Sequence, residues 1–403
     1  MHKKKILFVP FDLLAHYLRC LELAKSIRNE AVEIVFLQSV RYNDFIRNHG
    51  FRYTDGVCEG YSQVVMKAGK FDFSWINEKS TQKTVCSLME VLEDKNPDLV
   101  IGDTYPGLNI ACNYLKIEHI ALINAYVTNH YTGFRDTPHS HPANLFRRYV
   151  SQEKWTKIVM LAEDMMLRKV HSPYRKIREN LGLEPKVNLF DEFTGDTNFI
   201  VDDKQLFPTE GLPDNFIQEG PILFTCTQAE ERVHEFLHQH RSKPTIYVST
   251  GSSGKNIVPE TIHDSRLTGF NLIISGSERE SETENAIFRR FVNFDDIADK
   301  VDLVLCHGGN GTLYQALNAG KRIIAVPYIF EQEWNVQRFT TLNLCKVFYH
   351  DEKPEKLIRL IRQTLAEPPG TTCKDAFCAV PDIYKEFIFK SRVSDKNVLL
   401  IAD

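Results

Sequence analysis

A histidine followed by a glycine-rich turn is the feature of this sequence that points most directly to chemistry. Residues 307–312 read His-Gly-Gly-Asn-Gly-Thr, after an apolar run at 302–306 and before a stretch of helical periodicity that ends at Ala319. Glycines let a ligand approach the backbone closely, and the first turn of a helix offers free N–H groups and about half a positive charge. The turn therefore predicts a diphosphate site, where His307 and Thr312 donate hydrogen bonds to phosphate oxygens.

This segment, with residues 327–335 behind it, resembles the donor-binding signature of the family 1 glycosyltransferases, the small-molecule glycosyltransferases of plants, animals and bacteria. The resemblance implies that the histidine and the turn hold the diphosphate of a nucleotide sugar. It also implies that an acidic and an amide residue further along bind the sugar hydroxyls. Carried over position by position, these roles fall on His307, Gly309, Asn310, Gly311, Thr312, Glu331 and Gln332.

Two further loops complete the implied donor site. The turn after residues 245–249 resembles the family's glycine-serine loop on the opposite side of the phosphates, and the pair before residues 293–296 occupies the family's place for holding the nucleotide base. The residues concerned are Thr250, Gly251, Ser252, Ser253, Phe291 and Val292. One position departs from the family, because Gln315 stands where a glutamate usually accepts hydrogen bonds from the ribose, and an amide carbonyl accepts without charge.

The first loop of the chain carries a second match to the same family. His16 precedes the Leu-Ala-Lys of residues 23–25 at the family's spacing, with Ala15 in place of the usual glycine. In the family this histidine is the general base, and an aspartate at the end of a later strand orients it, which nominates Asp103 after the apolar run 99–102. The chemistry needs such a pair, because a hydroxyl becomes a good nucleophile when an imidazole takes its proton and a carboxylate stabilises the imidazolium.

Short runs rich in valine, isoleucine, leucine and phenylalanine alternate with helical patterns along the chain. These runs lie at 5–9, 33–37, 99–102, 119–123, 245–249, 272–275, 302–306 and 322–326. Such runs predict parallel strands that are buried on both faces, and open α/β sheets bind ligands at the carboxyl ends of their strands. With the resemblance, this pattern predicts an α/β protein of the GT-B type, in which two Rossmann-like domains face each other across a cleft.

The length and punctuation of the chain predict where these domains meet. A chain of 403 residues normally divides into two hydrophobic cores, and prolines and glycines cluster between residues 202 and 243. We therefore expect an acceptor-binding domain at 1–220 and a donor-binding domain at 221–380. The resemblance implies that the segment 381–403 returns to the first domain.

The composition is that of an ordinary globular protein. A net charge of -4 gives no reason to expect a nucleic acid as partner. Nine cysteines without a CxxC pair are typical of reduced, buried thiols in a cytoplasmic protein. The apolar run near the N-terminus is too short for a signal peptide, and no stretch reaches the ~18 apolar residues that span a membrane, so we expect a soluble protein.

Two segments carry competing signals. Residues 234–238 spell the HExxH of zinc proteases, although the surrounding residues 230–241 are typical of a polar linker helix, and we expect no metal. Between 147 and 178, basic residues alternate with methionines and aromatic residues. This pattern favours helices with a solvated basic face, and a weak peripheral contact with an anionic membrane is the alternative.

The function that these residues favour is an inverting glycosyl transfer by single displacement. The donor is a UDP- or dTDP-sugar, and the acceptor is a hydroxyl of a small or lipid-like molecule. Helix dipole, backbone amides and His307 can stabilise the departing diphosphate, so no metal or organic cofactor is expected. Two alternatives stay open, a nucleotide-sugar epimerase or hydrolase of the same fold and a catalytically silent sugar-nucleotide-binding partner, which the departure at Gln315 favours.

Overall fold

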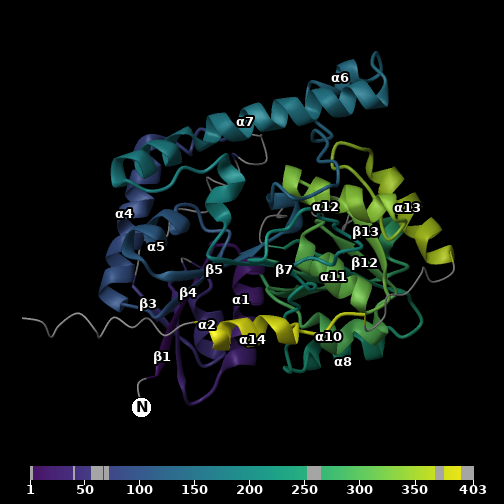
Figure 1. Cartoon of the computed structure of the whole chain (residues 1–403). Helices are drawn as coiled ribbons and strands as arrows, with labels where there is room; N and C mark the ends of the chain where they lie inside the picture. Colours follow the sequence, from purple (N-terminus) through teal and green to yellow (C-terminus); the bar gives the residue numbers. More distant parts are fainter. Residues whose placement is uncertain are drawn as a thin grey trace, which may run out of the picture.

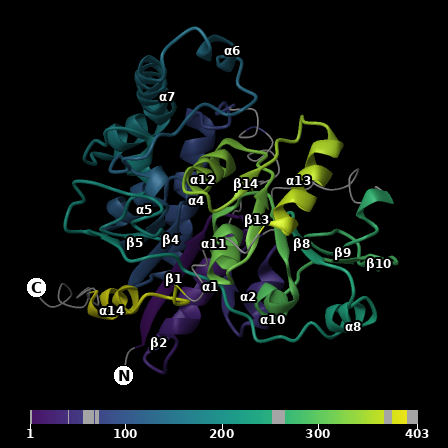
Figure 2. The ribbon, with the colours of Figure 1, turned by 90° about the vertical axis from the view of Figure 1, so that its right-hand side faces the viewer.

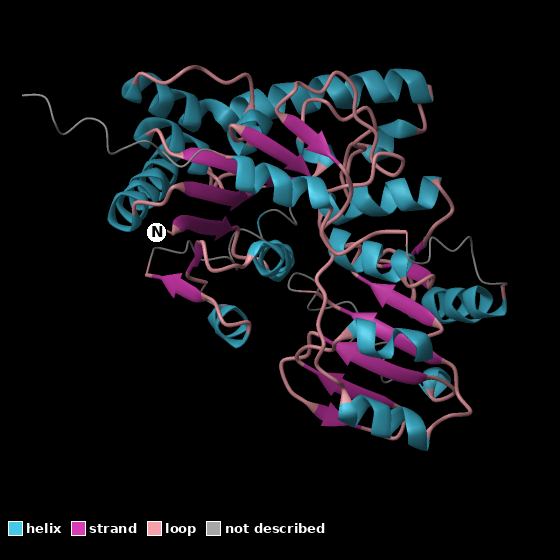
Figure 3. Cartoon of the chain, turned by 60° about the horizontal axis from the view of Figure 1, so that its bottom comes forward, coloured by secondary structure: helices cyan, strands magenta, loops and turns pink. Residues whose placement is uncertain are grey.

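The computed structural model describes residues 3–39, 41–55, 67, 72–251, 265–367 and 376–391 of the 403-residue chain. Within these ranges the chain forms two seven-stranded sheets, each flanked by helices (Figures 1 and 3). The predicted α/β fold with two sheets is confirmed. The predicted donor residues Ser252 and Ser253 lie outside the described ranges.

The first sheet is parallel throughout and has the strand order β3-β2-β1-β4-β5-β6-β7. Its strands are β1 (Lys4–Pro10), β2 (Val32–Leu37), β3 (Arg52–Thr54), β4 (Leu99–Asp103), β5 (Glu118–Ile123), β6 (Thr197–Ile200) and β7 (Phe216–Gln218). Successive side chains of β1 enter two cores, with Ile6 and Phe8 in one and Leu7 and Val9 in the other. Burial on both faces explains why this strand is a continuous apolar run.

The second sheet is parallel except for its β10–β11 pair and has the order β10-β11-β9-β8-β12-β13-β14. Its strands are β8 (Thr245–Ser249), β9 (Asn271–Ser275), β10 (Ser281–Glu282), β11 (Ala286–Arg289), β12 (Leu303–Cys306), β13 (Arg322–Ala325) and β14 (Lys346–Val347). β12 alternates in the same way as β1, since Leu303 and Leu305 enter one core while Val304 and Cys306 enter another.

Helices cover both faces of the two sheets (Figures 1 and 2). They are α1 (Leu14–Ile27), α2 (Asn43–Asn48), α4 (Glu78–Lys95), α5 (Leu108–Leu115), α6 (Asn144–Arg147), α7 (Gln152–Leu181), α8 (Glu231–Gln239), α10 (Phe294–Ile297), α11 (Asn310–Asn318), α12 (Phe330–Thr341), α13 (Pro354–Ala366) and α14 (Asp382–Lys390). Short 3-10 turns, η1 to η4, occupy Ala125–Val127, Leu189–Phe193, Ser265–Leu267 and Ala298–Lys300. In the described ranges, no helix is both long and apolar enough to cross a membrane.

The two sheets are joined by a shared core and by the C-terminal helix. Ile123 and Phe207 of the first half pack in one cluster with Tyr314 and Phe339 of the second half. Helix α14 lies beside α1 and under the first sheet, where Tyr384 is fully buried (Figure 1). The segment between the sheets belongs to the same region, because residues 222 and 224 are members of the core that contains Tyr384.

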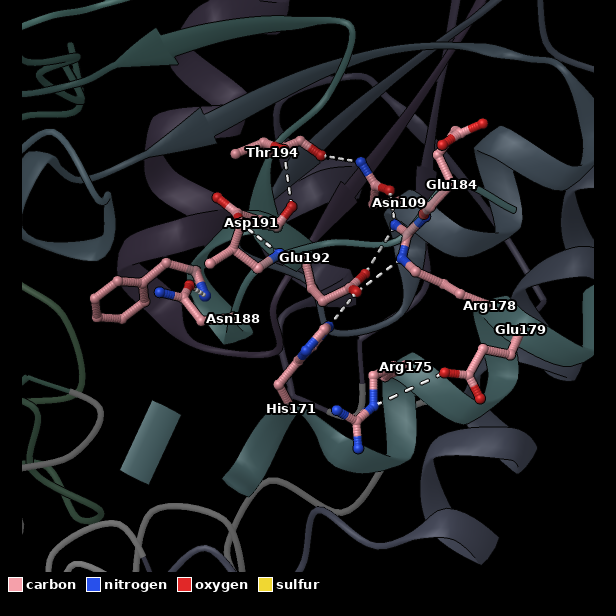
Figure 4. Close-up of polar contacts among 12 residues, drawn as sticks. Asn109, His171, Arg175, Arg178, Glu179, Glu184, Asn188, Asp191, Glu192 and Thr194 are labelled. Carbon is pink, nitrogen blue, oxygen red and sulfur yellow. Dashed lines mark hydrogen bonds and ion pairs between the residues drawn. The ribbon is translucent and has the colours of Figure 1, made fainter. Parts of the chain in front are cut away.

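Helix α7 is fixed to the first half by a buried polar cluster near its C-terminal end (Figure 4). Arg178 donates to both carboxylate oxygens of Glu192 at 2.8 and 2.9 Å, and the ring of His171 contacts the same carboxylate at 2.7 Å. Burial alone would raise the pKa of Glu192, but hydrogen bonds from His171 and Arg178 outweigh it and lower the pKa. The charges are therefore paired where water is excluded, which is the condition for a buried carboxylate.

The expectation of buried thiols is correct for Cys20, Cys112, Cys306 and Cys345. It is wrong for Cys86 and Cys378, which are exposed, and Cys226 is half-buried. Apolar neighbours in the sequence do not bury a thiol that lies on the outer face of a helix, as Cys86 does on α4. Cys58 and Cys373 lie outside the described ranges.

Candidate active site

His16 and Asp103 are brought together by the pairing of two neighbouring strands. Asp103 is the last residue of β4 and lies opposite Pro10 in the parallel β1–β4 pair, and His16 follows in the first turn of α1. The His16 Nδ1 and Asp103 Oδ1 atoms are 2.6 Å apart. The aspartate side chain is fully buried, whereas the histidine side chain is 13% exposed. This exposure leaves the imidazole accessible while the carboxylate behind it is shielded.

Arg19, which the sequence analysis did not identify, completes this cluster. Its Nε and Nη2 atoms donate to the two carboxylate oxygens of Asp103, and its Nη2 lies 3.1 Å from His16 Nδ1. Burial alone would raise the pKa of Asp103, but the charges of Arg19 and His16 outweigh it and lower the pKa to about 2. The carboxylate is therefore ionised at neutral pH. Arg19 could have been identified from its position three residues after His16, because residues three apart lie on the same face of a helix.

An aromatic pocket lies beside this cluster. The ring of Phe11 meets the rings of His16 and Tyr105 edge-on, with centroid distances of 5.8 and 6.3 Å. The pocket is lined by Phe11, Asp12, Trp75, Ile76, Ser80, Thr81, Thr84, Tyr105, Pro106 and Tyr174. In the described part of the chain, the Nε1 of Trp75 is buried without a hydrogen-bond partner. A buried donor of this kind normally has a partner, so a ligand oxygen in the pocket would satisfy it.

The ring of His307 lies in a slot that two glycines form at the end of β12. A Cβ atom placed on Gly251 or on Gly309 would lie 2.3 Å from the ring, so a side chain at either position would clash with it. Gly251 also has a φ of 60°, which favours glycine. The Nδ1 of His307 faces the carbonyl oxygen of Ser249 at 3.3 Å, and burial lowers the pKa of the imidazole to about 4.

A second group of predicted donor residues lies around a cavity at the junction of the two halves. Gln315 lines this cavity of about 530 Å³ and donates from Nε2 to the carbonyl oxygen of Phe224 at 3.0 Å. Phe291 packs edge-on between Phe224 and Phe45, and Val292 is buried. Phe291 and Val292 do not line the cavity, whose wall contains, besides Phe224 and Gln315, Leu223, Thr225, Cys226, Asp295, Ala298, Asp299, Asn318, Ala319, Lys321, Phe377 and Ala379.

Three other predicted donor residues form hydrogen bonds within the protein. Gln332 is 3% exposed, and its Oε1 accepts from the backbone N–H of Tyr328 at 2.8 Å at the start of α12. Glu331 accepts from the hydroxyl of Tyr126, across the junction between the halves, at 2.7 Å. The hydroxyl of Thr250 donates to a backbone carbonyl of β9 at 3.2 Å. Their roles in donor binding therefore stay predictions.

A chain of hydrogen bonds connects the His16 cluster with the glycine-rich turn. Arg19 donates to Asn124 Oδ1 at 3.1 Å, and Asn124 donates to the carboxylate of Asp202 at 3.2 Å. Asn310, in the first turn of α11, donates to the same carboxylate at 2.6 Å. Asp202 lies two residues after the end of β6 and is fully buried, and its carboxylate also accepts from the backbone N–H of Ala125 at 2.7 Å. Gly311 and Thr312 continue the same turn.

The HExxH segment lies on α8, away from these clusters. His234 contacts Asp296 Oδ2 through Nε2 at 2.8 Å and faces the ammonium of Lys300 through Nδ1 at 2.6 Å. The described ranges contain no group of three histidine, cysteine or acidic side chains that is arranged to hold a metal ion. His234 thus takes part in charge pairing, but the expectation of a polar linker helix is wrong, because Val233, Phe236 and Leu237 of α8 are buried in the hydrophobic core.

Known proteins are similar to this chain in sequence and in fold, and a protein family matches most of its second half. Residues 245–381 match the glycosyltransferase family 28 C-terminal domain. The chain is 25% identical to the PGL/p-HBAD biosynthesis glycosyltransferase of Mycobacterium tuberculosis, over 83% of this chain and 78% of that protein. The calicheamicin glycosyltransferase CalG4 has a similar structure, with a TM-score of 0.62 and 17% identity over 91% of each chain.

The spinosyn rhamnosyltransferase SpnG, complexed with thymidine diphosphate, is also similar in structure. Its TM-score is 0.59 at 13% identity, and the match covers 90% of this chain and 92% of that one. The two sheets have the GT-B arrangement, and the match of residues 245–381 together with these relatives shows a glycosyltransferase similar to the family 1 enzymes.

Proposed function

We propose that the chain transfers a sugar from a UDP- or dTDP-sugar to an acceptor hydroxyl with inversion, and that His16 is the general base. The observation that carries this proposal is the hydrogen-bond chain from Arg19 through Asn124 and Asp202 to Asn310. It joins the His16 cluster to the glycine-rich turn, and both lie at the carboxyl ends of strands in their sheets. A base and a phosphate-binding turn on facing elements are what a single displacement between two substrates requires.

In the proposed reaction, His16 Nε2 takes the proton of the acceptor hydroxyl as its oxygen attacks the anomeric carbon. The bond between that carbon and the diphosphate oxygen breaks in the same step, so the configuration inverts. Asp103 accepts the Nδ1–H of His16, which fixes the tautomer with a free Nε2 and stabilises the imidazolium. The N-terminus of α11 and the ring of His307 stabilise the leaving diphosphate.

The donor side of the proposal includes the cavity beside Gln315. Its wall joins residues 315–319, in the middle and at the end of α11, to residues 223–226 of the connecting segment, and its volume of about 530 Å³ has room for a nucleoside beside Gln315. The relative SpnG was solved with thymidine diphosphate, which supports a nucleoside diphosphate as the ligand class. Gln315 would have to exchange its bond to Phe224 for one to the ribose.

The acceptor side of the proposal is the aromatic pocket beside His16. Rings of Phe11, Trp75 and Tyr105 offer flat apolar contacts, and the unpartnered Nε1 of Trp75 offers one donor. We therefore propose an acceptor with an aromatic or apolar body and a hydroxyl near His16. Aromatic side chains pack against such bodies in offset or edge-on arrangements.

The direct test of the donor assignment is a thermal-shift panel with UDP, dTDP, GDP and ADP. A ligand that binds the folded state raises the melting temperature in proportion to ln(1 + [L]/Kd). We expect UDP or dTDP to stabilise the protein and His307→Ala to weaken that effect. If none of the four nucleotides shifts the transition, the donor site is wrongly assigned. Product analysis with and without an aryl alcohol is a separate test, and it distinguishes a glycosyltransferase from an epimerase or hydrolase of the nucleotide sugar.

A further inference from the structure

Helix α7 carries an apolar face that points away from the protein. Ile158, Leu161 and Met165 are 53%, 64% and 63% exposed, and their spacing of three and four residues places them on one side of the helix. The opposite side of the helix is buried through Trp155, Val159, Leu167, His171, Tyr174 and Ile177. We name the three exposed residues the α7 face.

Lysines lie at both ends of the α7 face. Lys154 precedes Ile158 by one helical turn, and Lys169 follows Met165 by one turn, so both side chains continue the same side of the helix. Both lysines are exposed. Long lysine side chains at such positions can lay their apolar stems along the face and place their ammonium groups at its border.

The short helix α6, next to the start of α7, also exposes apolar side chains. Leu145, Phe146 and Tyr149 are 69%, 66% and 70% exposed, and Arg148 lies over the ring of Tyr149 at 4.8 Å. α6 is held next to the start of α7, because Arg147 lies 5.9 Å from the ring of Trp155. Both views place α6 and α7 at the same outer edge of the molecule (Figures 1 and 2).

The α7 face is not a consequence of a loosely held helix. The C-terminal part of α7 is fixed by the buried cluster of Arg178, Glu192 and His171 (Figure 4). Its middle is fixed by Glu163, which forms an ion pair of 2.6 Å with the half-buried Arg135. Large apolar side chains that a well-anchored helix keeps in water are the usual mark of an interaction surface.

We propose that α6 and the α7 face dock on the surface of an anionic lipid membrane. The charge favours this partner, because Lys154, Lys169 and Arg148 surround the exposed apolar residues. Basic side chains are attracted to an anionic surface, and an amphipathic helix buries its apolar face at the boundary of head groups and acyl chains. The contact is peripheral, with α7 lying in the plane of the membrane.

The test is co-sedimentation of the full chain with vesicles of phosphatidylcholine alone, or mixed in equal parts with phosphatidylglycerol. We expect about tenfold stronger binding to the mixed vesicles, and a loss of binding as added salt shortens the screening length from about 8 Å to about 3 Å. Met165→Glu should abolish binding. Met160→Glu is the matched control, because Met160 is 58% exposed on the same helix but lies on another side.

Three results would overturn the proposal. They are equal binding to both kinds of vesicle, equal binding by the two methionine variants, and a dimer that Met165→Glu converts to monomer, which would assign the face to a second copy of the chain. Sedimentation equilibrium without vesicles measures the last of these. The vesicle assay contains neither donor nor acceptor, so its failure would not affect the proposed glycosyl transfer.

Discussion

Arg19 changes the expected behaviour of the residues around the proposed base. A lone aspartate behind a histidine favours the imidazolium, whereas here the guanidinium neutralises Asp103 and lies 3.1 Å from His16 Nδ1. Donation from two nitrogens of the guanidinium fixes the orientation of the carboxylate that contacts His16 Nδ1. Arg19 is thus a positioning residue for the pair.

Replacement of Arg19 tests this role. We expect Arg19→Gln to lower turnover by less than the roughly 10²–10⁴-fold that removal of a general base costs. The loss should lie in kcat, with the donor KM little changed, because the neutral amide no longer fixes the carboxylate that orients His16. Arg19→Lys keeps the charge but not the contact through two nitrogens, so it should lose less turnover than Arg19→Gln. If both variants keep the turnover of the unaltered chain, Arg19 has only a structural role.

His307 predicts a pH-dependent affinity for the donor. Its pKa of about 4 means that the free protein carries a neutral imidazole above pH 5. The Nδ1–H then faces the Ser249 carbonyl, so Nε2 donates to a phosphate only when the ring is protonated. Binding a diphosphate therefore raises the pKa and takes up a proton, and affinity should increase as pH falls from 8 to 5, by at most about tenfold per pH unit.

Isothermal titration calorimetry with UDP or dTDP at several pH values measures this dependence. The terminal phosphate of the nucleotide also titrates in this range. The His307→Asn variant corrects for this contribution, because it binds the same nucleotide but has no imidazole. We expect the variant to bind more weakly and with a flatter pH dependence. Parallel dependences in the two proteins would mean that His307 does not contact the phosphates.

Single residues were predictable to the extent that their role depends on local sequence. The spacing around His16 and the strand that ends in Asp103 predicted a pair that lies 2.6 Å apart. Gln332 is assigned to the sugar by resemblance, and its amide oxygen caps the start of α12 in this structure, so its role in donor binding stays a prediction. Resemblance identifies a position, and the conformation of the side chain depends on neighbours that the sequence does not reveal.

At the scale of elements, α14 packs against the first sheet although it lies more than 160 residues after the last strand of that sheet, β7. The hydroxyl of Tyr384 donates to the carbonyl oxygen of Ile200 at 2.8 Å, and its ring stacks on Phe199 with a centroid distance of 4.4 Å. The residue is fully buried. It therefore links the C-terminal segment to β6 and to the connection between the two halves.

Loss of this side chain should destabilise the first half of the molecule. Tyr384→Ala removes a large buried ring, and such truncations typically cost about 3–5 kcal/mol in the free energy of unfolding. Phe389→Ala on the same helix is the control, because Phe389 is 48% exposed and should change stability by less than about 0.5 kcal/mol. Chemical denaturation followed by circular dichroism measures both, and equal losses would contradict the docking of α14.

The elements themselves were largely predictable. Each apolar run proposed as a strand lies in one, because a strand buried on both faces has to be continuously apolar. The missed strands, such as β3, β6, β11 and β14, are two to four residues long. Runs that short carry no periodicity, and their pairing depends on neighbours in the sheet.

At the scale of the molecule, the junction of the two halves holds the features that the sequence did not predict. Asp202 joins Asn124 of the first half to Asn310 of the second, and Tyr126 meets Glu331 across the same junction. These partners are far apart in the chain, and each is an ordinary polar residue in its local context. Their function is defined only by the way in which the two sheets meet.

The proposed transfer depends on this junction, because base and donor turn belong to different halves. His16→Ala should therefore remove the base without affecting the donor site. Asp103→Asn should also lower turnover, because the amide can favour the wrong imidazole tautomer. Its effect should largely disappear in a His16→Ala background, since two residues that act as one unit do not add.

The most direct measurement is the rate of sugar transfer to an aryl alcohol by the unaltered chain and by His16→Ala, with donor affinity measured on the same samples. The donor is the nucleotide sugar whose nucleotide stabilises the protein. We expect the variant to keep the donor dissociation constant within about twofold and to lose roughly 10²–10⁴-fold in turnover. Full turnover in His16→Ala, with donor binding intact, would contradict the assignment of His16 as the base.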